Sequence, residues 1–211
     1  MFDLSSLSRA IEGGDREKSV QLTTEAISAG TNPTDIIAHG LQAGMGAVGE
    51  KFSSGEYFLP DMLMAARAMK AALEVLAPLL DKTGIPTIGK VVIGTVEGDM
   101  HDIGKNVVAT FLKGSGFEVF DLGLNVPDQK FIDEVKDKSP DILGLSALLT
   151  TTMPFMGRII KALEAGGLRS GVKVIVGGAP ITQDYANYIG ADAYAHDGGK
   201  AIQVCKQLLG K

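Results

Sequence analysis

The stretch of residues 91–105 reads Val-Val-Ile-Gly-Thr-Val-Glu-Gly-Asp-Met-His-Asp-Ile-Gly-Lys and contains the pattern that recurs through most of the chain. Its first part, Val91–Val96, is rich in β-branched residues and too short for a helix, which predicts a buried strand. A polar loop follows, and a helical pattern then runs from Gly104 to Lys113. The stretch therefore predicts a strand, a loop and a helix in succession.

The same succession recurs along the rest of the chain. Further strands are predicted at 117–122, 142–145, 172–176 and 191–195, and the helices that follow them at 127–136, 153–165, 182–188 and 199–209. Parallel strands need crossover helices and are buried on both faces. The alternation predicts an α/β fold with a doubly wound, five-stranded parallel sheet of the Rossmann or flavodoxin-like type. Its ligand is expected at the carboxyl ends of the strands, where the strand order reverses.

The amino-terminal part of the chain predicts helices only. Apolar residues recur at helical spacing in four segments, at 4–11, 20–27, 33–55 and 60–80. Four helices joined by short loops favour a four-helix bundle. We therefore predict a helical domain at 1–82, a turn-rich linker at 83–89 and the α/β domain at 90–211.

Composition and charge exclude several classes of function. The 211-residue chain has a net charge of −5 and no basic stripe, which argues against a nucleic-acid partner. No apolar run reaches the roughly 18 residues of a membrane helix, and the first residues lack the pattern of a signal peptide. The single Cys205 provides no disulfide framework. We expect a cytoplasmic protein with no membrane partner.

The loop after the first predicted strand allows three interpretations. In the first, His101 is a solvated loop residue and Asp102 caps the next helix. The second, a phosphate-binding loop, fails because the glycine spacing is one residue too long and Asn106 replaces the required Ser or Thr. In the third, Asp99 accepts a hydrogen bond from one ring nitrogen of His101 while the other binds a metal. Zinc usually takes three or four protein ligands, whereas a metal already held by a macrocycle needs one axial ligand.

Three elements at the ends of predicted strands carry a specific resemblance. They are Asp99-x-His101-x-x-Gly104, Ser146-x-Leu148 and Gly177-Gly178. Together they resemble the signature of cobalamin-binding domains in cobalamin-dependent methionine synthase, the mutases and corrinoid methyl-carrier proteins. The helical part, with Gly46-x-x-Gly49-Glu50-Lys51-Phe52 and Glu56-Tyr57-Phe58-Leu59-Pro60, is similar to the helical cap of methionine synthase and of small corrinoid proteins.

The resemblance implies a role for each matching residue. His101 is expected to be the lower axial ligand of cobalt in a base-off, His-on corrinoid, with Asp99 as its hydrogen-bonded partner and the Thr152 hydroxyl completing the relay. Phe52 and Leu59 are expected to shield the upper face of the corrinoid. The remaining expected cofactor contacts lie on four loops: Gly98, Met100, Asp102, Ile103, Gly104, Ser146, Leu148, Thr150, Gly177, Gly178 and Gly198.

The resemblance also implies a function and a set of partners. A substrate-specific methyltransferase is expected to place a methyl group on Co(I), and a second methyltransferase to remove it from methyl-Co(III), with tetrahydrofolate or coenzyme M as acceptor. A reductive activase is a further expected partner. On this view the chain is a methyl-carrier subunit that does not catalyse methyl transfer without its partner enzymes. The alternative is a cobalamin sensor, but such regulators carry a DNA-binding segment, and none fits in this sequence.

Overall fold

The first helices of the chain begin at aspartates that cap them. In the computed structural model, which describes residues 2–80 and 87–211, α1 (Leu4–Glu12) begins after Asp3 and α2 (Arg16–Ser28) after Asp15. Each aspartate accepts a 2.9 Å hydrogen bond from a backbone N–H of the first turn. Such caps satisfy donors that have no partner within the helix.

The helix predicted at 33–55 contains an unexpected π-helical segment. The structure divides it into α3 (Pro33–Asp35), the π-helix η1 (Ile36–Gln42) and α4 (Ala43–Ser53), and the last helix of this part is α5 (Leu59–Leu80). Gly40 lies against α1, because a Cβ at this position would be 2.7 Å from Leu7 Cδ2. The apolar spacing predicts helix correctly here, but it does not distinguish an α-helical turn from a π-helical one.

Strands and helices alternate through the rest of the chain. The strands are β1 (Lys90–Thr95), β2 (Glu118–Asp121), β3 (Ile142–Ser146), β4 (Lys173–Gly177) and β5 (Ala193–Tyr194). The helices are α6 (Ile103–Gly114), α7 (Asp128–Lys138), α8 (Met153–Ala165), the short 3₁₀-helix η2 (Arg169–Gly171), α9 (Gln183–Ile189) and α10 (Gly198–Leu208). All paired strands are parallel, in the order β2-β1-β3-β4-β5. This flavodoxin-like order confirms the predicted doubly wound five-stranded sheet, and it reverses between β1 and β3.

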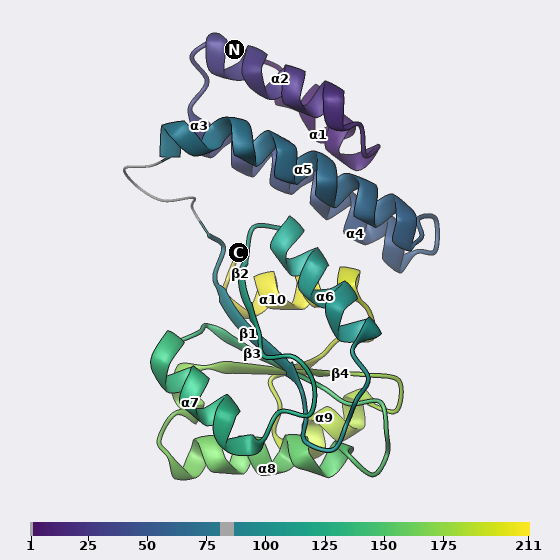
Figure 1. The fold of residues 1–211 in the computed structure, drawn as a ribbon, viewed down its shortest axis with the longest axis vertical. Helices are drawn as coiled ribbons and strands as arrows, with labels where there is room; N and C mark the ends of the chain where they lie inside the picture. The colour runs from purple at the N-terminus through teal and green to yellow at the C-terminus, as the bar shows by residue number, and fades with distance from the viewer. Residues whose placement is uncertain (1, 81–86) are drawn as a thin grey trace. The chain divides into compact units, whose positions relative to one another are not determined.

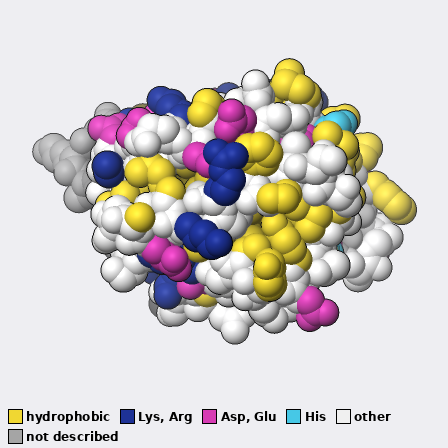
Figure 2. Space-filling view, turned by 90° about the horizontal axis from the view of Figure 1, so that it is seen from below, with side chains coloured by type: hydrophobic (Ala, Val, Ile, Leu, Met, Phe, Trp, Pro, Cys, Tyr) yellow, Lys and Arg dark blue, Asp and Glu magenta, His cyan; other side chains and the backbone are white. Residues whose placement is uncertain are grey.

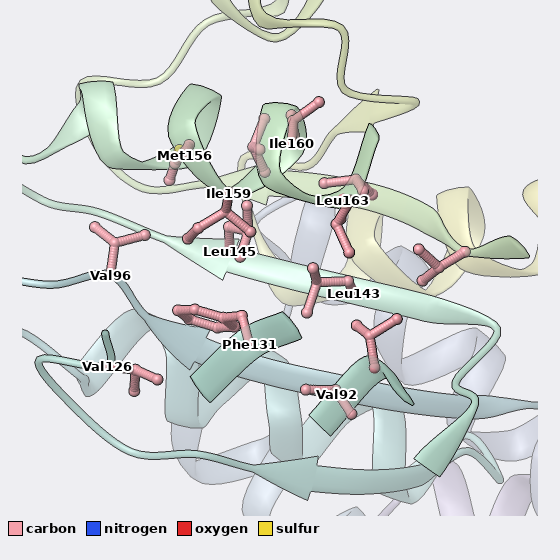
Figure 3. Close-up of a cluster of buried hydrophobic side chains, with 14 of the residues drawn as sticks. Val92, Val96, Val126, Phe131, Leu143, Leu145, Met156, Ile159, Ile160 and Leu163 are labelled. Atoms are coloured by element: carbon pink, nitrogen blue, oxygen red, sulfur yellow. The ribbon is translucent and has the colours of Figure 1, made fainter. Parts of the chain in front are cut away.

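The two faces of the sheet are covered by different helices. Helices α6 and α10 lie on one face, and α7, α8 and α9 on the other (Figure 1). Figure 3 shows the core between the sheet and the second set, where Phe131 of α7 and Ile159 of α8 are fully buried against Leu143 and Val92. Alternate strand residues supply this core, as expected for strands buried on both faces. On the outer side of α8, apolar side chains lie among charged ones (Figure 2).

The chain divides into two compact units. One comprises Met1–Thr87 with Lys113–Gly116, and the other comprises Ile88–Leu112 with Phe117–Lys211. The predicted linker at 83–89 falls largely outside the described residues. Among the helices of the described chain, none is both long enough and apolar enough to cross a membrane.

Candidate cofactor-binding site

The loop between β1 and α6 carries the candidate ligand at the point where the strand order reverses. Its backbone turns at Gly98, whose φ of +80° lies in the left-handed region that favours glycine. His101 follows, just before the first turn of α6, and its carbonyl accepts a 3.0 Å hydrogen bond from the Thr95 hydroxyl. His101 thus lies at the carboxyl edge of the sheet, at the place where doubly wound folds bind ligands.

Asp99 is the buried centre of this loop, with no exposed surface. Its Oδ1 accepts a 3.1 Å bond from the backbone N–H of His101 and lies 2.8 Å from Nδ1 of the same residue. Its Oδ2 accepts bonds from the N–H groups of Leu148 and Leu149, at 2.8 and 3.2 Å, and lies 2.7 Å from Thr152 Oγ1. The carboxylate therefore joins the loop after β1 to the loop after β3.

These hydrogen bonds determine the charge of Asp99. Burial by itself raises the pKa of a carboxyl group, because it penalises the charged form. Here the bonds from the Thr152 hydroxyl, from His101 and from the two backbone amides outweigh burial and hold the pKa of Asp99 well below its ordinary value of 3.8. Asp99 is consequently a carboxylate at neutral pH.

The carboxylate fixes the orientation and the tautomer of His101. Since Asp99 accepts at Nδ1, that nitrogen carries the proton, and the lone pair remains on Nε2. The His101 side chain is 49% exposed. An oriented imidazole with one accessible lone pair is the form in which histidine binds metals.

Thr152 stabilises the same carboxylate from α8's amino-terminal end. Its hydroxyl has one proton and two nearby acceptors, Asp99 Oδ2 at 2.7 Å and the Leu149 carbonyl at 2.9 Å. The charged oxygen is the stronger acceptor. Thr152 is only 5% exposed, so the bond is protected from water.

Replacement of Thr152 tests this bond. We expect Thr152→Val, which has a similar shape and no hydroxyl, to lower the free energy of unfolding by about 2 kcal/mol, because a buried hydrogen bond to a charged group is lost. Urea unfolding measures the change. The control is Thr152→Ser, which keeps the hydroxyl. Equal stability of the two variants would show that the hydroxyl does not stabilise Asp99.

Exposed apolar side chains lie on the two loops that Asp99 joins. Exposed fractions are 65% for Met100 and 78% for Ile103 on the first loop, and 42% for Leu148 and 40% for Leu149 after β3. Met100, Ile103 and Leu148 were expected from the resemblance, whereas Leu149 was not. Exposed apolar residues on neighbouring loops are typical of a binding surface, and the pair Leu148-Leu149, which begins two residues after the end of β3, is the signal that could have identified Leu149.

Small residues occupy the neighbouring strand ends on the face covered by α6 and α10. Ser146 of β3 pairs in register with Thr95 of β1 and with Gly177 of β4. A Cβ at Gly177 would lie 2.8 Å from the Ala195 carbonyl oxygen. Gly178, with a φ of +132°, has no room for a side chain beside the Ala147 carbonyl. The chain's own backbone therefore requires glycine at both positions, whatever binds beside them.

Gly104 has no such requirement from the protein. It lies in the first turn of α6, and a Cβ built on it meets no atom within 4 Å. Glycine inside a helix is less favourable than alanine by roughly 0.5–1 kcal/mol. Gly104 has no side chain and faces open space, and it lies three residues after His101. This arrangement fits a large ligand that approaches the backbone at Gly104.

The other predicted contacts have different surroundings. Asp102 precedes α6 and accepts a 3.0 Å bond from the Asn106 amide. Thr150 is exposed in the turn before α8. Gly198 begins α10 with Phe111 packed against it, so a Cβ would overlap that ring. Phe52 and Leu59 belong to the helical unit, at the end of α4 and the start of α5, where Leu59 is 39% exposed.

The fold and the site together define a doubly wound domain that presents one oriented histidine to a ligand at its switch point. Comparison with known proteins agrees. Two family models, each described as a B12 binding domain, match the chain, one over residues 89–205 and the other over residues 4–77. The chain is 43% identical over 208 residues to the trimethylamine corrinoid protein of Methanosarcina barkeri, covering 98% of this chain and 96% of that one.

Solved structures show the same relationship. A cobalamin-binding protein from Desulfitobacterium hafniense superposes with a TM-score of 0.86 at 37% identity, over 99% of both chains. A chain of the methanol:cobalamin methyltransferase complex from Methanosarcina barkeri superposes with a TM-score of 0.83 at 31% identity, over 98% of this chain and 79% of that one. The chain belongs to the B12-binding family of corrinoid proteins, which confirms the resemblance found in the sequence.

Proposed function

We propose that the chain is a methyl-carrier subunit that binds a base-off corrinoid, with His101 Nε2 as the lower axial ligand of cobalt. The observation that carries the proposal is the buried relay from Thr152 through Asp99 to His101, which holds one imidazole with its free lone pair accessible. When bound, the corrinoid supplies the metal that accepts the methyl group as Co(I) and carries it as methyl-Co(III). Asp99, supported by Thr152, orients the His101 imidazole and holds its proton at Nδ1.

The surroundings of His101 fit a corrinoid. The exposed apolar residues Met100, Ile103, Leu148 and Leu149 match the apolar face of a macrocycle, and the open position at Gly104 leaves the backbone accessible. For the nucleotide tail we propose Ser146, Thr150 and the backbone at Gly177, Gly178 and Gly198. For the upper face we propose Phe52 and Leu59 of a cap formed by residues 1–82.

The relay gives the chain control over the strength of ligation. A carboxylate that accepts from Nδ1 makes Nε2 a better donor to a metal, and outer-shell partners of this kind typically change metal affinity or activity 10- to 100-fold. The proton between His101 and Asp99 is held at Nδ1 and stabilised by the charge of the carboxylate. Ligation of cobalt is therefore expected to respond to changes at Asp99 as well as at His101.

Two methyltransferases are the proposed partners. One loads the methyl group from a substrate, and the other passes it to tetrahydrofolate or coenzyme M; a reductive activase completes the set. Similar chains are named trimethylamine and dimethylamine corrinoid proteins, so methylated amines are the first donors to test. We propose a cytoplasmic location for these reactions.

The direct test begins with the corrinoid. The purified chain is loaded with base-off cobalamin, reduced, and mixed with a methylamine methyltransferase and its substrate. We expect the absorption spectrum of the bound corrinoid to change on methylation and to revert when an acceptor methyltransferase and coenzyme M or tetrahydrofolate are added. A chain that binds no corrinoid, or that binds it without either spectral change, would refute the proposal.

Substitution of Gly104 separates binding from folding. We expect Gly104→Ala to raise the free energy of unfolding of the corrinoid-free protein by up to about 1 kcal/mol, because alanine favours the helix. The same methyl group should weaken corrinoid binding by about 1–3 kcal/mol, because it occupies space the cofactor needs. Thermal unfolding and corrinoid titration measure the two effects.

Gly171 provides the matched control for that substitution. It lies in η2, before the amino end of β4, and a Cβ there also meets no atom within 4 Å. Gly171→Ala should leave corrinoid affinity unchanged. If Gly104→Ala binds corrinoid as tightly as Gly171→Ala does, the cofactor does not approach Gly104.

A further inference from the structure

We infer that residues 121–126, which comprise the last residue of β2 and the loop that follows it, are a positioning element for His101 that holds the β1–α6 loop at both of its ends. Asn125 acts on the beginning of that loop, and Asp121 acts on its end through Lys105. The inference rests on the proposed ligation of cobalt by His101. Asn125 and Asp121 are positioning residues, because neither contacts His101 itself.

Asn125 forms hydrogen bonds with both ends of the two-residue segment Gly98-Asp99. Its Oδ1 accepts a 2.7 Å bond from the Gly98 N–H, and its own N–H donates a 3.1 Å bond to the Asp99 carbonyl. It does so with a φ of +49°, a conformation that asparagine tolerates better than most residues. The next residue, Val126, forms a parallel bridge to Val96, so this contact extends the sheet by one step.

Lys105 fixes the other end of the loop. Its side chain is 1% exposed, although it carries an ammonium group. The Nζ atom lies 2.7 Å from both carboxylate oxygens of Asp121 and 2.7 Å from Asn106 Oδ1. A buried charge of this kind persists only when it is paired and hydrogen-bonded. The pair therefore ties the first turn of α6 to the end of β2.

Asp121 and Asn106, the two partners of Lys105, each form one further hydrogen bond. Asp121 Oδ1 also accepts a 2.9 Å bond from the Gly123 N–H, within the loop that carries Asn125. The Asn106 amide donates to Asp102, the neighbour of His101, at 3.0 Å. One loop is thus bonded to both ends of the segment that carries the ligand.

The position of Nε2 depends on these contacts because packing constrains His101 little. The ring is about half exposed, and its own polar partners are Asp99 at Nδ1 and at the backbone N–H, and Thr95 at the carbonyl. Asp99 is in turn fixed by its backbone as well as by its carboxylate. Loss of the Asn125 contact with the segment Gly98-Asp99 should therefore let the ring move away from cobalt while the protein stays folded.

Two substitutions at Asn125 isolate the side-chain contact. Asn125→Gly keeps the left-handed backbone and its N–H donor but loses the acceptor for Gly98. Asn125→Asp keeps an acceptor oxygen and a side chain that tolerates the same backbone conformation. Asn125 is exposed, so neither change should prevent folding. Asp121→Asn, which removes the charge opposite Lys105, tests the other end.

The readout is the axial ligand of the bound corrinoid. In the Co(II) state, electron paramagnetic resonance shows a splitting from an axial nitrogen, and labelling of the histidine ring nitrogens changes that splitting. We expect the ratio of His-on to His-off protein to fall roughly 10-fold in Asn125→Gly, as for other outer-shell partners, and to fall in Asp121→Asn. Asn125→Asp should restore the wild-type ratio, with thermal midpoints recorded for all variants.

Each outcome has a separate meaning. If the wild type shows no label-sensitive splitting, His101 is not the ligand, and the proposed ligation and this inference are both wrong. If the wild type shows it and Asn125→Gly and Asp121→Asn retain the wild-type ratio, this inference alone is overturned. It is also overturned if Asn125→Asp loses ligation to the same extent as Asn125→Gly, because the acceptor oxygen would then have no role.

Discussion

The variant His101→Ala is expected to retain a bound corrinoid while losing the axial nitrogen of cobalt. Alanine removes the side chain that carries Nε2 but leaves the contacts proposed for the nucleotide tail at Ser146 and Gly177. Corrinoid affinity should fall at least as much as the 10- to 100-fold loss typical of outer-shell partners, since the ligand itself is removed. Paramagnetic resonance of the Co(II) form measures ligation, and titration measures affinity.

A second histidine on the same edge of the sheet is the matched control. His196 Nδ1 lies 2.9 Å from Asp197 Oδ2, and the His196 side chain is 55% exposed, so this histidine resembles His101 in exposure and in having a carboxylate partner at Nδ1. His196→Ala should keep the axial nitrogen signal of the wild type. The assignment of His101 fails if His101→Ala keeps that signal or if His196→Ala loses it.

The variant Asp99→Asn is expected to lose ligation although His101 is still present. One amide oxygen can accept from Leu148, Leu149 and Thr152, but the amide NH₂ then faces Nδ1 of His101. Nδ1 must accept this bond, so the ring proton moves to Nε2 and the lone pair needed by cobalt is lost. The rotated amide is no better, because its NH₂ would face three donors.

The same substitution should reduce stability at neutral pH. The charge that accepts the buried hydrogen bonds is removed, and the backbone N–H of His101 loses its acceptor, which together should lower the free energy of unfolding by about 2–4 kcal/mol. Urea unfolding measures this loss. Asp197→Asn, which changes the cap of α10 to an equally good capping residue, is the control and should change neither stability nor ligation.

Acid should reduce the difference between the wild type and Asp99→Asn. The pKa of Asp99 is lower in the folded chain than its ordinary value of 3.8. A carboxyl group of this kind contributes its full stabilisation above about pH 3.8 and loses it as the pH falls towards the folded pKa. The amide at residue 99 of the variant does not titrate in this range. The free energy of unfolding should therefore fall faster in the wild type than in the variant below pH 3.8. A constant difference across this range would mean that Asp99 is not a hydrogen-bonded carboxylate.

Local patterns along the chain predict much of the fold. Short β-branched runs followed by helical periodicity indicate the five strands and their crossover helices, because burial on both faces of a parallel sheet leaves that signature. The same periodicity misses the π-helical character of Ile36–Gln42. A helix of either type places apolar residues along one side, so hydrophobic spacing does not contain the hydrogen-bond pattern.

The candidate site divides into parts that a sequence reveals and parts that it hides. The loop with Asp99 and His101 is recognisable because its residues are adjacent. Asn125 and Asp121 are not, because their effect on that loop depends on β2 lying beside β1, which a sequence does not state. The resemblance predicts Gly177 and Gly178 as cofactor contacts, and the structure adds that neighbouring carbonyls exclude a side chain at both positions.

The separation of Thr152 from Asp99 along the chain has a consequence for the synthesis of the protein. Their hydrogen bond joins residues 53 positions apart, and the two amides that share the carboxylate are 49 and 50 positions from it. A nascent chain in which β3 is still inside the ribosome cannot complete the relay. The oriented form of His101 is therefore completed only after β1 and β3 have both left the ribosome and paired.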